Sequence, residues 1–596
     1  MTKNGLLDEL NPQQQQAVIY THGPQLILAG AGSGKTRVLT YKVAYLIDQQ
    51  NTPPDAILMV TFTNKAAAEM KNRISTLLHN NQALPFAGTF HSFCARVLRR
   101  EGRILGLAPD FTIYDEIDQK DAIVTLMKQL AISPQEIHPG SIRTTISQAK
   151  NELLSAQEYA AIARGRFQEK AARIYIEYEK LLRQSQAVDF DDLLLLTVRL
   201  LTITPHITTR YQKQYKHLLV DEYQDTNTAQ FELTRILSHL SEQITVVGDA
   251  SQSIYAWRGA NFQNITRFRT QFPQTKTFHL TQNYRSTKSI LEGANSVIKK
   301  NTGHDVLNLW TDNPKGEKIT LFEARNEQTE ALFIISEIEK HNLPWSSVAV
   351  LYRTNAQSRV IEEALLHAGI PYHLVGGVRF YERKEIKDVL AYLRLVANPD
   401  DTMAKKRIEK IGKNRARRFW EWQEKKPTGT TEELLEKLLK TVPYLELYDK
   451  NNPEDTVRLE NVKELKSVAS VFPHLTDFLE NVALVEAEYL PTSPLEQVNT
   501  ITLMTMHAAK GLEFPTVFIV GMEEGLFPHS RAFLNNEELE EERRLCYVAM
   551  TRAKTRLYLT HARRRLYFGQ YTSNIPSRFL ADIPESVTQE THWDSY

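Results

Sequence analysis

The residues with the clearest chemical use lie in the stretch AGAGSGKTRV. Gly30, Gly32 and Gly34 let backbone N–H groups converge on phosphate oxygens, and Lys35 follows at the position from which an ammonium group reaches the outer phosphates of a nucleotide. The Thr36 hydroxyl is a suitable Mg²⁺ ligand. The apolar run LIL precedes the stretch and a helix-compatible segment follows it, which favours a phosphate loop over a glycine-rich loop with a chance lysine.

An acidic pair follows a second apolar run, in HLLVDEYQDTN. Asp221 can hold Mg²⁺ through water, and Glu222 can polarise an attacking water, two functions that phosphoryl transfer requires. Acidic pairs are also common at solvated strand ends, so the pair gains weight from the phosphate loop. A third run, in VVGDASQSIYAWRGA, places the Gln252 amide where it could sense the terminal phosphate, although a loop glutamine would have the same sequence.

Two aromatic residues and a cation come directly after Gln252. Tyr255, Trp257 and Arg258 form a pattern that binds single strands without sequence preference, because every base offers a π-face to an exposed ring. Taken alone, the two aromatic residues would be interpreted as core residues. A kinase or a transporter would not require such a pattern, so we expect a nucleotide-driven enzyme that acts on a polynucleotide.

The composition limits the class of protein. The chain has 596 residues, more than the roughly 250–300 at which single cores stop growing, so several domains are expected. The formal charge is 72 minus 71, or +1, so binding to nucleic acid must come from a local groove. Cys94 and Cys546 fit a reducing compartment. We find no signal core and no run of about 18 apolar residues, and we expect a cytoplasmic protein without a membrane partner.

Short apolar runs recur between longer helix-compatible stretches, which is typical of a parallel sheet covered on both faces. The pattern occurs once between residues 24 and 282 and again between residues 319 and 561. A long helical insertion interrupts each set. The second insertion contains TGTTEELLEKLLKTV, in which Thr430 or Thr431 could cap a helix and Glu433 completes the capping pattern. The sequence therefore predicts an α/β chain with two interrupted parallel sheets.

Eleven motifs identify a family that the chain resembles. The motifs are LNPQQQQAV, AGAGSGKTRV, TFTNKAAAEM, GTFHSFC, VDFDDLL, VDEYQDT, GDASQSIYAWRGA, LTQNYRS, YRTNAQSR, MTMHAAKGLEF and EERRLCYVAMTRAK. In type and order they resemble those of superfamily-one DNA helicases of the UvrD, PcrA and Rep type, from about residue 8 to residue 584. The resemblance implies two RecA-like lobes, each with an inserted helical domain: 1–89 and 206–282 for lobe 1A, 90–205 for insertion 1B, 283–380 and 495–584 for lobe 2A, 381–494 for a shortened insertion 2B, and 585–596 for a short tail.

The resemblance also implies which residues bind ATP. Gln14 corresponds to the glutamine that reads the adenine edge, Tyr284 to the aromatic that stacks on the base, and Glu513 to a residue near the ribose. Arg285 and Arg552 resemble arginines that reach the terminal phosphate from the far side of a cleft, where such a residue can raise phosphoryl-transfer rates by about 10³–10⁵. The remaining nucleotide contacts implied are Ala29, Gly30, Ala31, Gly32, Ser33, Gly34, Lys35, Thr36 and Arg37.

The DNA contacts implied by the resemblance are spread over both lobes. They are Phe62, Thr63, Asn64, His91, Tyr255, Trp257 and Arg258 in the first lobe, and Arg359, His507 and Phe568 in the second. For Phe62 and Phe568, a place in the hydrophobic core remains the alternative. Phosphate contacts predict that binding weakens with salt.

The resemblance implies an ATP-dependent 3′–5′ DNA helicase and single-strand translocase, with a role in DNA repair or replication. ATP and Mg²⁺ are the expected cofactors, and single-stranded DNA and its junctions with duplex are the expected partners. We expect a monomer in isolation, with possible accessory proteins. The shortened second insertion and the absence of a long C-terminal extension leave open a translocase that unwinds weakly without a partner.

Three other classes of protein are alternatives to this interpretation. A motor directed to RNA is opposed only by the aromatic DNA track. A non-catalytic binding protein would have lost one of Lys35, Asp221, Glu222, Gln252, Arg285 or Arg552, and all six are present. A helicase–nuclease subunit would need a nuclease constellation after the second lobe, and the twelve residues after Pro584 leave no room for one.

Overall fold

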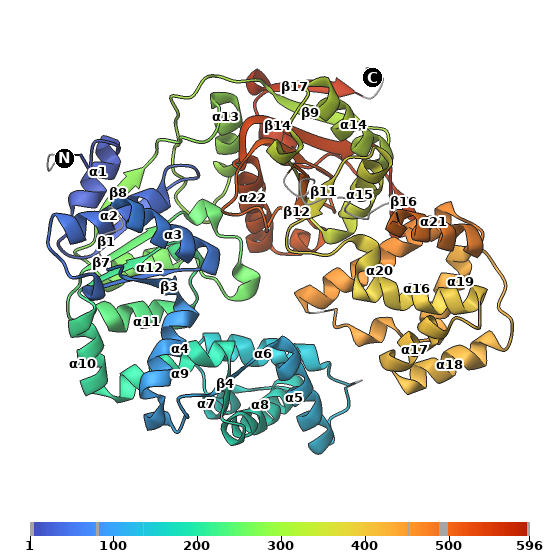
Figure 1. Cartoon of the computed structure of the whole chain (residues 1–596), viewed down its shortest axis with the longest axis horizontal. Helices are drawn as coiled ribbons and strands as arrows, with labels where there is room; N and C mark the ends of the chain where they lie inside the picture. The colour runs from blue at the N-terminus through green and yellow to red at the C-terminus, as the bar shows by residue number, and fades with distance from the viewer. Residues whose placement is uncertain (1–4, 79–82, 135, 451, 488–498, 593–596) are drawn as a thin grey trace. The chain divides into compact units, whose positions relative to one another are not determined.

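The chain forms two compact units, each built around a parallel sheet (Figure 1). The computed structural model describes residues 5–78, 83–134, 136–450, 452–487 and 499–592. Unit 1 comprises Met1–Tyr284 and His304–Asp312, and unit 2 comprises Arg285–Gly303 and Asn313–Tyr596. Unit 1 thus ends two residues beyond the boundary predicted after residue 282, and it also includes the later segment His304–Asp312, which no local sequence pattern indicated.

The sheet of unit 1 has the strand order β3-β2-β6-β7-β1-β8, and all of its pairs are parallel. Five of its strands are apolar runs predicted from the sequence, because strands of a sheet covered on both faces are apolar along their whole length. β3 is the addition. The bounds are β1 (Gln25–Ala29), β2 (Ile57–Thr61), β3 (Phe86–Thr89), β6 (His217–Val220), β7 (Ile244–Gly248) and β8 (Lys276–Leu280).

Helices cover both faces of this sheet. One buried cluster joins β1 and β2 to α1 (Pro12–Ile19), α2 (Lys35–Asp48) and α3 (Asn64–Leu77). Another joins the sheet to α4 (Phe90–Glu101), α9 (Phe190–Ile203), α11 (Thr228–Ser238) and α12 (Asn264–Gln271). A short helix, α10 (Pro205–Gln214), leads into β6. The carboxyl ends of the parallel strands, where the predicted chemical residues lie, therefore rest on a rigid core.

The first inserted domain has a core of its own. It contains α5 (Glu116–Gln129), α6 (Pro139–Asn151), α7 (Ala156–Ile162), α8 (Arg166–Gln184) and a two-stranded parallel ribbon of β4 (Thr112–Tyr114) and β5 (Ala187–Asp189). Lys150 is fully buried, and its Nζ lies 2.7 Å from Asp189 Oδ2 and 2.8 Å from Asp192 Oδ1. The ion pairs join the end of α6 to the beginning of α9.

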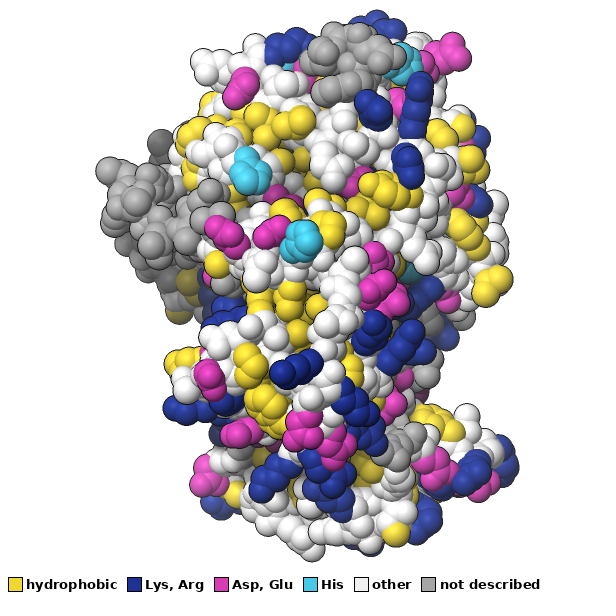
Figure 2. All heavy atoms as spheres, turned by 90° about the vertical axis from the view of Figure 1, so that its right-hand side faces the viewer, with side chains coloured by type: hydrophobic (Ala, Val, Ile, Leu, Met, Phe, Trp, Pro, Cys, Tyr) yellow, Lys and Arg dark blue, Asp and Glu magenta, His cyan; other side chains and the backbone are white. Residues whose placement is uncertain are grey.

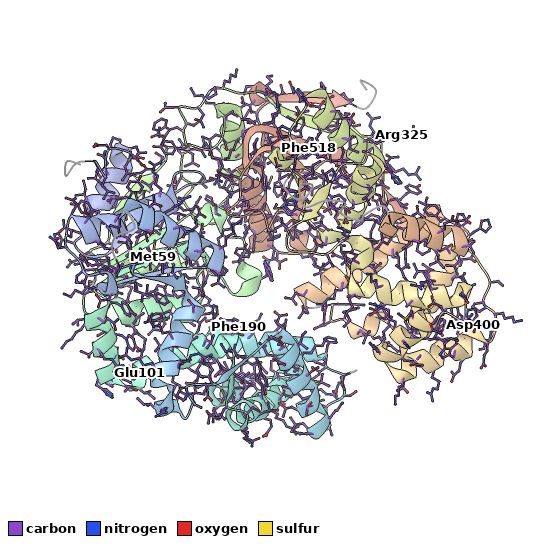
Figure 3. The ribbon with its side chains drawn as sticks, in the orientation of Figure 1. Met59, Glu101, Phe190, Arg325, Asp400 and Phe518 are labelled. Atoms are coloured by element: carbon purple, nitrogen blue, oxygen red, sulfur yellow. The ribbon has the colours of Figure 1, made fainter. Side chains whose placement is uncertain are left out.

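The sheet of unit 2 has the order β11-β12-β10-β13-β14-β9-β17, again all parallel. Its strands are β9 (Ile319–Ala324), β10 (Val348–Tyr352), β11 (Tyr372–Leu374), β12 (Ile501–Thr505), β13 (Phe514–Ile519), β14 (Ala553–Ala562) and β17 (Thr588–His592). A buried cluster joins the sheet, which includes Phe518 (Figure 3), to α14 (Glu327–Lys340) and α15 (Ser358–His367). Two further helices, α13 (Lys288–Ile298) and α22 (Asn536–Met550), contact β14 from the other side (Figure 1).

The second inserted domain is helical, as predicted. It consists of α16 (Lys384–Ala397), α17 (Thr402–Ile411), α18 (Lys413–Gln423), α19 (Thr431–Thr441), α20 (Pro453–Val471) and α21 (Leu475–Ala487) around one buried cluster. Thr430 caps α19 and the Glu433 carboxylate accepts a hydrogen bond from the Thr430 N–H, which confirms the predicted capping box. The predicted end of this domain, at residue 494, lies outside the described residues.

The segment after Pro584 contains a strand that the sequence did not predict. Residues 588–592, expected to belong to a short tail, form β17 and pair with β9 from Thr588↔Ile319 to His592↔Glu323. The strand has the sequence TQETH, which is polar throughout, so it carries no apolar pattern that could have predicted it. Within the described part of the chain, no helix is long and apolar enough to cross a membrane.

Candidate active site

The predicted phosphate loop lies between β1 and the first turn of α2. Gly32 and Gly34 have φ values of 65° and 86°, a conformation that favours glycine. The carbonyl oxygens of the loop are held by neighbouring residues: Ala31 O accepts from Asn283 Nδ2 at 2.8 Å, and Gly32 O accepts from the Tyr284 N–H at 2.9 Å. Since the carbonyls are engaged in this way, the loop presents the N-terminus of α2, with Lys35 as its first residue, to an anion.

Asp221 follows β6 and lies beside the phosphate loop. Thr36 Oγ1 donates to Asp221 Oδ2 at 3.3 Å, so the two predicted Mg²⁺ ligands are adjacent. Burial, and then the neighbouring charge of Glu222, raise the pKa of Asp221 to about 7, while Lys35 acts in the opposite direction. Two hard oxygen ligands fit Mg²⁺, which binds through one or two protein oxygens together with phosphates and water. Among the described residues, no group of three or more His, Cys, Asp or Glu side chains could hold a metal ion by itself.

Glu222 is held by a residue that the sequence did not single out. Its backbone has a φ of 52°, a strained conformation for a non-glycine residue. The Gln224 amide donates from Nε2 to Glu222 Oε2 at 2.5 Å, and Gln224 Oε1 accepts from the Asp249 N–H at 3.0 Å. Gln252 donates to Asp249 Oδ2 at 2.5 Å, so the carboxyl ends of β6 and β7 form one hydrogen-bonded network. Gln224 lies in the VDEYQDT motif, and this position was the signal that could have identified it.

The residues predicted to bind adenine gather on the other side of the phosphate loop, at the beginning of α1. Gln14 is buried, and its Nε2 donates to Ser33 O at 3.0 Å. Tyr284 is half exposed, and its hydroxyl accepts from Asn11 Nδ2 at 2.6 Å. Arg37 Nη2 donates to Glu9 O at 2.9 Å. Unit 1 therefore brings together the residues predicted for the base and those predicted for the phosphates.

Three of the predicted nucleotide residues belong to unit 2 and lie together there. Arg285 Nε pairs with Glu513 Oε2 at 2.8 Å, and Arg285 Nη1 donates to Thr551 O at 3.2 Å. Arg552, only 2% exposed, donates from Nε to Val548 O at 2.9 Å and from Nη1 to Leu512 O at 3.1 Å. Partial burial opposes ionisation of Glu513, but the hydrogen bond from Lys554 and the charge of Arg285 lower its pKa.

The predicted DNA residues of unit 1 include a row of aromatic rings. Phe62 and Tyr255 stack with centroids 5.8 Å apart and planes 8° apart, and Trp257 meets Tyr255 edge-on at 6.4 Å. Trp257 is 44% exposed, which excludes a core role for it. Thr63 caps α3 and is exposed, as is Asn64. The side chain of Arg258, the remaining residue of this row, lies outside the described part of the structure.

His91 forms a second aromatic contact in unit 1. Its ring meets that of Phe190 edge-on, with centroids 5.9 Å apart. Burial lowers the pKa of His91, so its neutral form is favoured. Phe190 is 51% exposed at the first position of α9, and the sequence reasoning missed it although it lies in the VDFDDLL motif. An exposed phenylalanine in a helix-starting position was the signal that could have identified it.

The residues predicted to contact DNA in unit 2 differ from one another in burial. Arg359 is 5% exposed, and its guanidinium pairs with Glu464 at 2.8 Å and with Glu363 at 2.9 Å. Its charge is therefore balanced by two carboxylates of the same unit. His507 and Phe568 are both partly exposed. Those two positions remain predicted contacts.

The chain belongs to the UvrD/REP helicase family. Residues 10–273 match the UvrD/REP helicase N-terminal domain, and residues 278–427 and 413–564 match the UvrD-like helicase C-terminal domain.

The relatives of the chain include ATP-dependent DNA helicases named PcrA. Those of Staphylococcus aureus (strain Mu50 / ATCC 700699) and Bacillus subtilis (strain 168) are each 42% identical to it over 643 residues, which cover 98% of this chain and 88% and 87% of those proteins. The PcrA helicase of Leuconostoc citreum is 42% identical over 99% of this chain and 87% of its own. A solved C-terminal domain of a possible DNA helicase from Lactobacillus plantarum aligns with a TM-score of only 0.24 at 11% identity, over 52% of this chain and 98% of that one, too low to bear on the fold.

Proposed function

We propose that this protein is an ATP-dependent DNA translocase and 3′–5′ helicase. One observation carries the proposal: the hydrogen-bonded network around Asp221 and Glu222 includes Gln252, and three residues further along the chain Tyr255 belongs to the row of aromatic rings. A change in the nucleotide site therefore has a direct route to the residues that suit stacking on bases. Kinases and transporters have no use for that continuity.

The residues divide the work of hydrolysis. Lys35 and the N-terminus of α2 bind the phosphates, and Glu222, held by Gln224, orients and polarises the attacking water. Thr36 and Asp221 would hold Mg²⁺, which neutralises charge on the phosphate oxygens when it is bound. Arg285 and Arg552 would stabilise the charge that develops on the transferred phosphoryl group. Both arginines belong to unit 2, whereas Lys35 and Glu222 belong to unit 1.

The DNA partner is single-stranded DNA and its junction with duplex. Phe62, Tyr255 and Trp257 provide flat rings, and base stacking on such rings contributes about 1–3 kcal/mol for each base. For the duplex side, α17 and α18 expose several cations. The exposed cations on these helices are Lys406, Lys410, Lys413, Arg417 and Arg418. Figure 2 shows Lys and Arg side chains, with Asp and Glu side chains among them, over the lower half of the face that it draws. Such a surface suits phosphate contacts that weaken with salt.

Strand displacement tests the proposal. We expect the protein, with ATP and Mg²⁺, to separate a duplex that carries a 3′ single-stranded DNA tail, and to leave the 5′-tailed duplex paired. Lys35→Ala abolishes strand separation because the phosphates lose their ammonium partner. Separation of the 5′-tailed duplex alone would contradict the polarity, and equal activity on a matched RNA duplex would favour the RNA-directed motor.

A further inference from the structure

The turn that carries Phe568 has an unusual conformation. β15 (Arg565–Tyr567) and β16 (Gln570–Thr572) pair through Tyr567↔Gln570, so Phe568 and Gly569 form the turn between them. Phe568 has a φ of 55° and Gly569 a φ of 78°. Positive φ is costly for a bulky residue such as phenylalanine, so contacts outside the hairpin must stabilise this turn.

Helix α20 of the second inserted domain supplies those contacts. The Gly569 N–H donates to Ser467 Oγ at 3.0 Å, and the Phe568 N–H donates to Glu464 Oε2 at 3.4 Å. Ser467 Oγ in turn donates to the same Glu464 Oε2 at 3.2 Å. Both N–H groups of the turn therefore donate to side chains of α20, and these two side chains lie one helical turn apart.

Arg359 fixes the other oxygen of Glu464. Arg359 Nε and Nη2 donate to Glu464 Oε1 at 3.0 and 2.8 Å, and Arg359 Nη1 donates to Glu363 Oε2 at 2.9 Å. Arg359 and Glu464 are 5% and 3% exposed. Charge-assisted hydrogen bonds in a buried pair hold both partners in a defined geometry. Glu464 thus connects α15 of the parallel-sheet domain to the turn of the hairpin.

Close packing at Gly569 points to the same contact independently. A Cβ on Gly569 would lie 3.0 Å from Lys466 Cβ, so a larger residue would be crowded against α20, and the φ of 78° also favours glycine. The Phe568 ring is partly exposed, Tyr567 stacks on it with centroids 3.8 Å apart, and Lys463 Nζ lies 5.5 Å from its centroid. A flat ring beside an exposed cation suits one nucleotide of a single strand, a base on the ring and a phosphate on the ammonium group.

We propose that Glu464 and Ser467 are positioning residues for a DNA contact of Phe568, so that the second inserted domain completes the DNA track of unit 2. The proposal rests on the proposed function, because it requires Phe568 to contact single-stranded DNA. The helix α20 sets the direction in which the ring points, and an altered α20 contact weakens DNA binding without touching the nucleotide site.

A double-mutant cycle on the full chain tests this proposal. The dissociation constant (Kd) of a fluorescein-labelled oligothymidine is measured by anisotropy for the native chain, Phe568→Ala, Ser467→Ala and the double variant. We expect Phe568→Ala to raise Kd at least about fivefold through loss of base stacking. Ser467→Ala should raise it about two- to twelvefold, as expected for one neutral hydrogen bond, with no further increase when Phe568 is already alanine.

Three controls separate positioning from a general loss of structure. Ser470→Ala removes another hydroxyl of α20, one that donates to Ser467 O and has no recorded contact with the turn, and should leave Kd at the native value. ATP hydrolysis without DNA should be unchanged in Ser467→Ala, and its melting temperature shows whether the chain still folds. Glu464→Gln is the second variant, and we expect it to raise Kd in the same direction.

The outcomes distinguish the two proposals. A native Kd for Ser467→Ala and Glu464→Gln, with a weakened Phe568→Ala, would overturn the positioning role and leave the DNA contact intact. An equal effect of Ser467→Ala in both backgrounds would also overturn it, because the residue would then act on structure alone. A native Kd for Phe568→Ala would remove the DNA contact itself.

Discussion

Replacing Gln224 by glutamate should slow ATP hydrolysis without weakening nucleotide binding. The Gln224 amide donates to Glu222 at 2.5 Å and accepts from the Asp249 N–H at 3.0 Å. A carboxylate in its place keeps the second hydrogen bond, loses the first and brings a negative charge next to Glu222. Loss of a hydrogen bond to a charged group costs about 1.5–3 kcal/mol. If that energy is lost from the transition state, kcat falls about 10- to 150-fold.

The assay is steady-state ATP hydrolysis at saturating single-stranded DNA across the neutral pH range. We expect a lower kcat in Gln224→Glu with little change in the KM for ATP, and an acid limb of the pH–rate profile displaced to higher pH by the added charge. Gln212→Glu is the matched control, because Gln212 is also buried in unit 1 and donates to Ile236 O, away from Glu222. A native kcat with an unmoved acid limb in Gln224→Glu would refute the positioning of Glu222 by this amide.

Three further predictions concern stability. A Cβ at Gly30 would lie 2.3 Å from Leu309 Cδ2, so Gly30→Ala should lower the free energy of unfolding by about 1–3 kcal/mol, and Leu309→Ala in the same chain should recover part of that loss in urea titrations. Burial, and then nearby cations, lower the pKa of His217 from 6.5 to about 4. Between these two pH values the unfolded state therefore binds a proton that the folded state does not. The free energy of unfolding falls as the pH drops through this window, and His217→Gln should flatten that pH dependence. Lys150→Met leaves two buried aspartates without their cation and should cost about 3–5 kcal/mol, whereas Lys180→Met, which removes an exposed pair, should cost about 1 kcal/mol or less; equal costs would contradict the difference in burial.

The sequence predicted those parts of the fold that depend on local pattern. The apolar runs became the strands of two parallel sheets because strands buried on both faces carry no polar alternation. The phosphate loop formed where its glycines stand, since Gly32 and Gly34 need positive φ. The capping box at Thr430 depends only on residues three positions apart. Each of these features lies within a few residues of the sequence pattern that predicted it.

The parts that were missed depend on contacts between distant segments. The ion pairs of Arg359 were not predicted, because its partner Glu464 lies 105 positions further along the chain. The strand β17 has a polar sequence and is defined only by its pairing with β9. The segment His304–Asp312 joins unit 1 because Leu309 packs against Gly30, a contact with no trace in either local sequence. Burial and long-range pairing determine the positions of these residues. The periodicity of apolar residues along the sequence predicts neither.

The rate of ATP hydrolysis with and without single-stranded DNA tests the central claim most directly. We predict that DNA stimulates hydrolysis severalfold or more in the native chain, and that Trp257→Ala weakens the stimulation while fluorescent-nucleotide binding is retained. Equal rates with and without DNA in the native chain would contradict the coupling of the nucleotide network to the aromatic row.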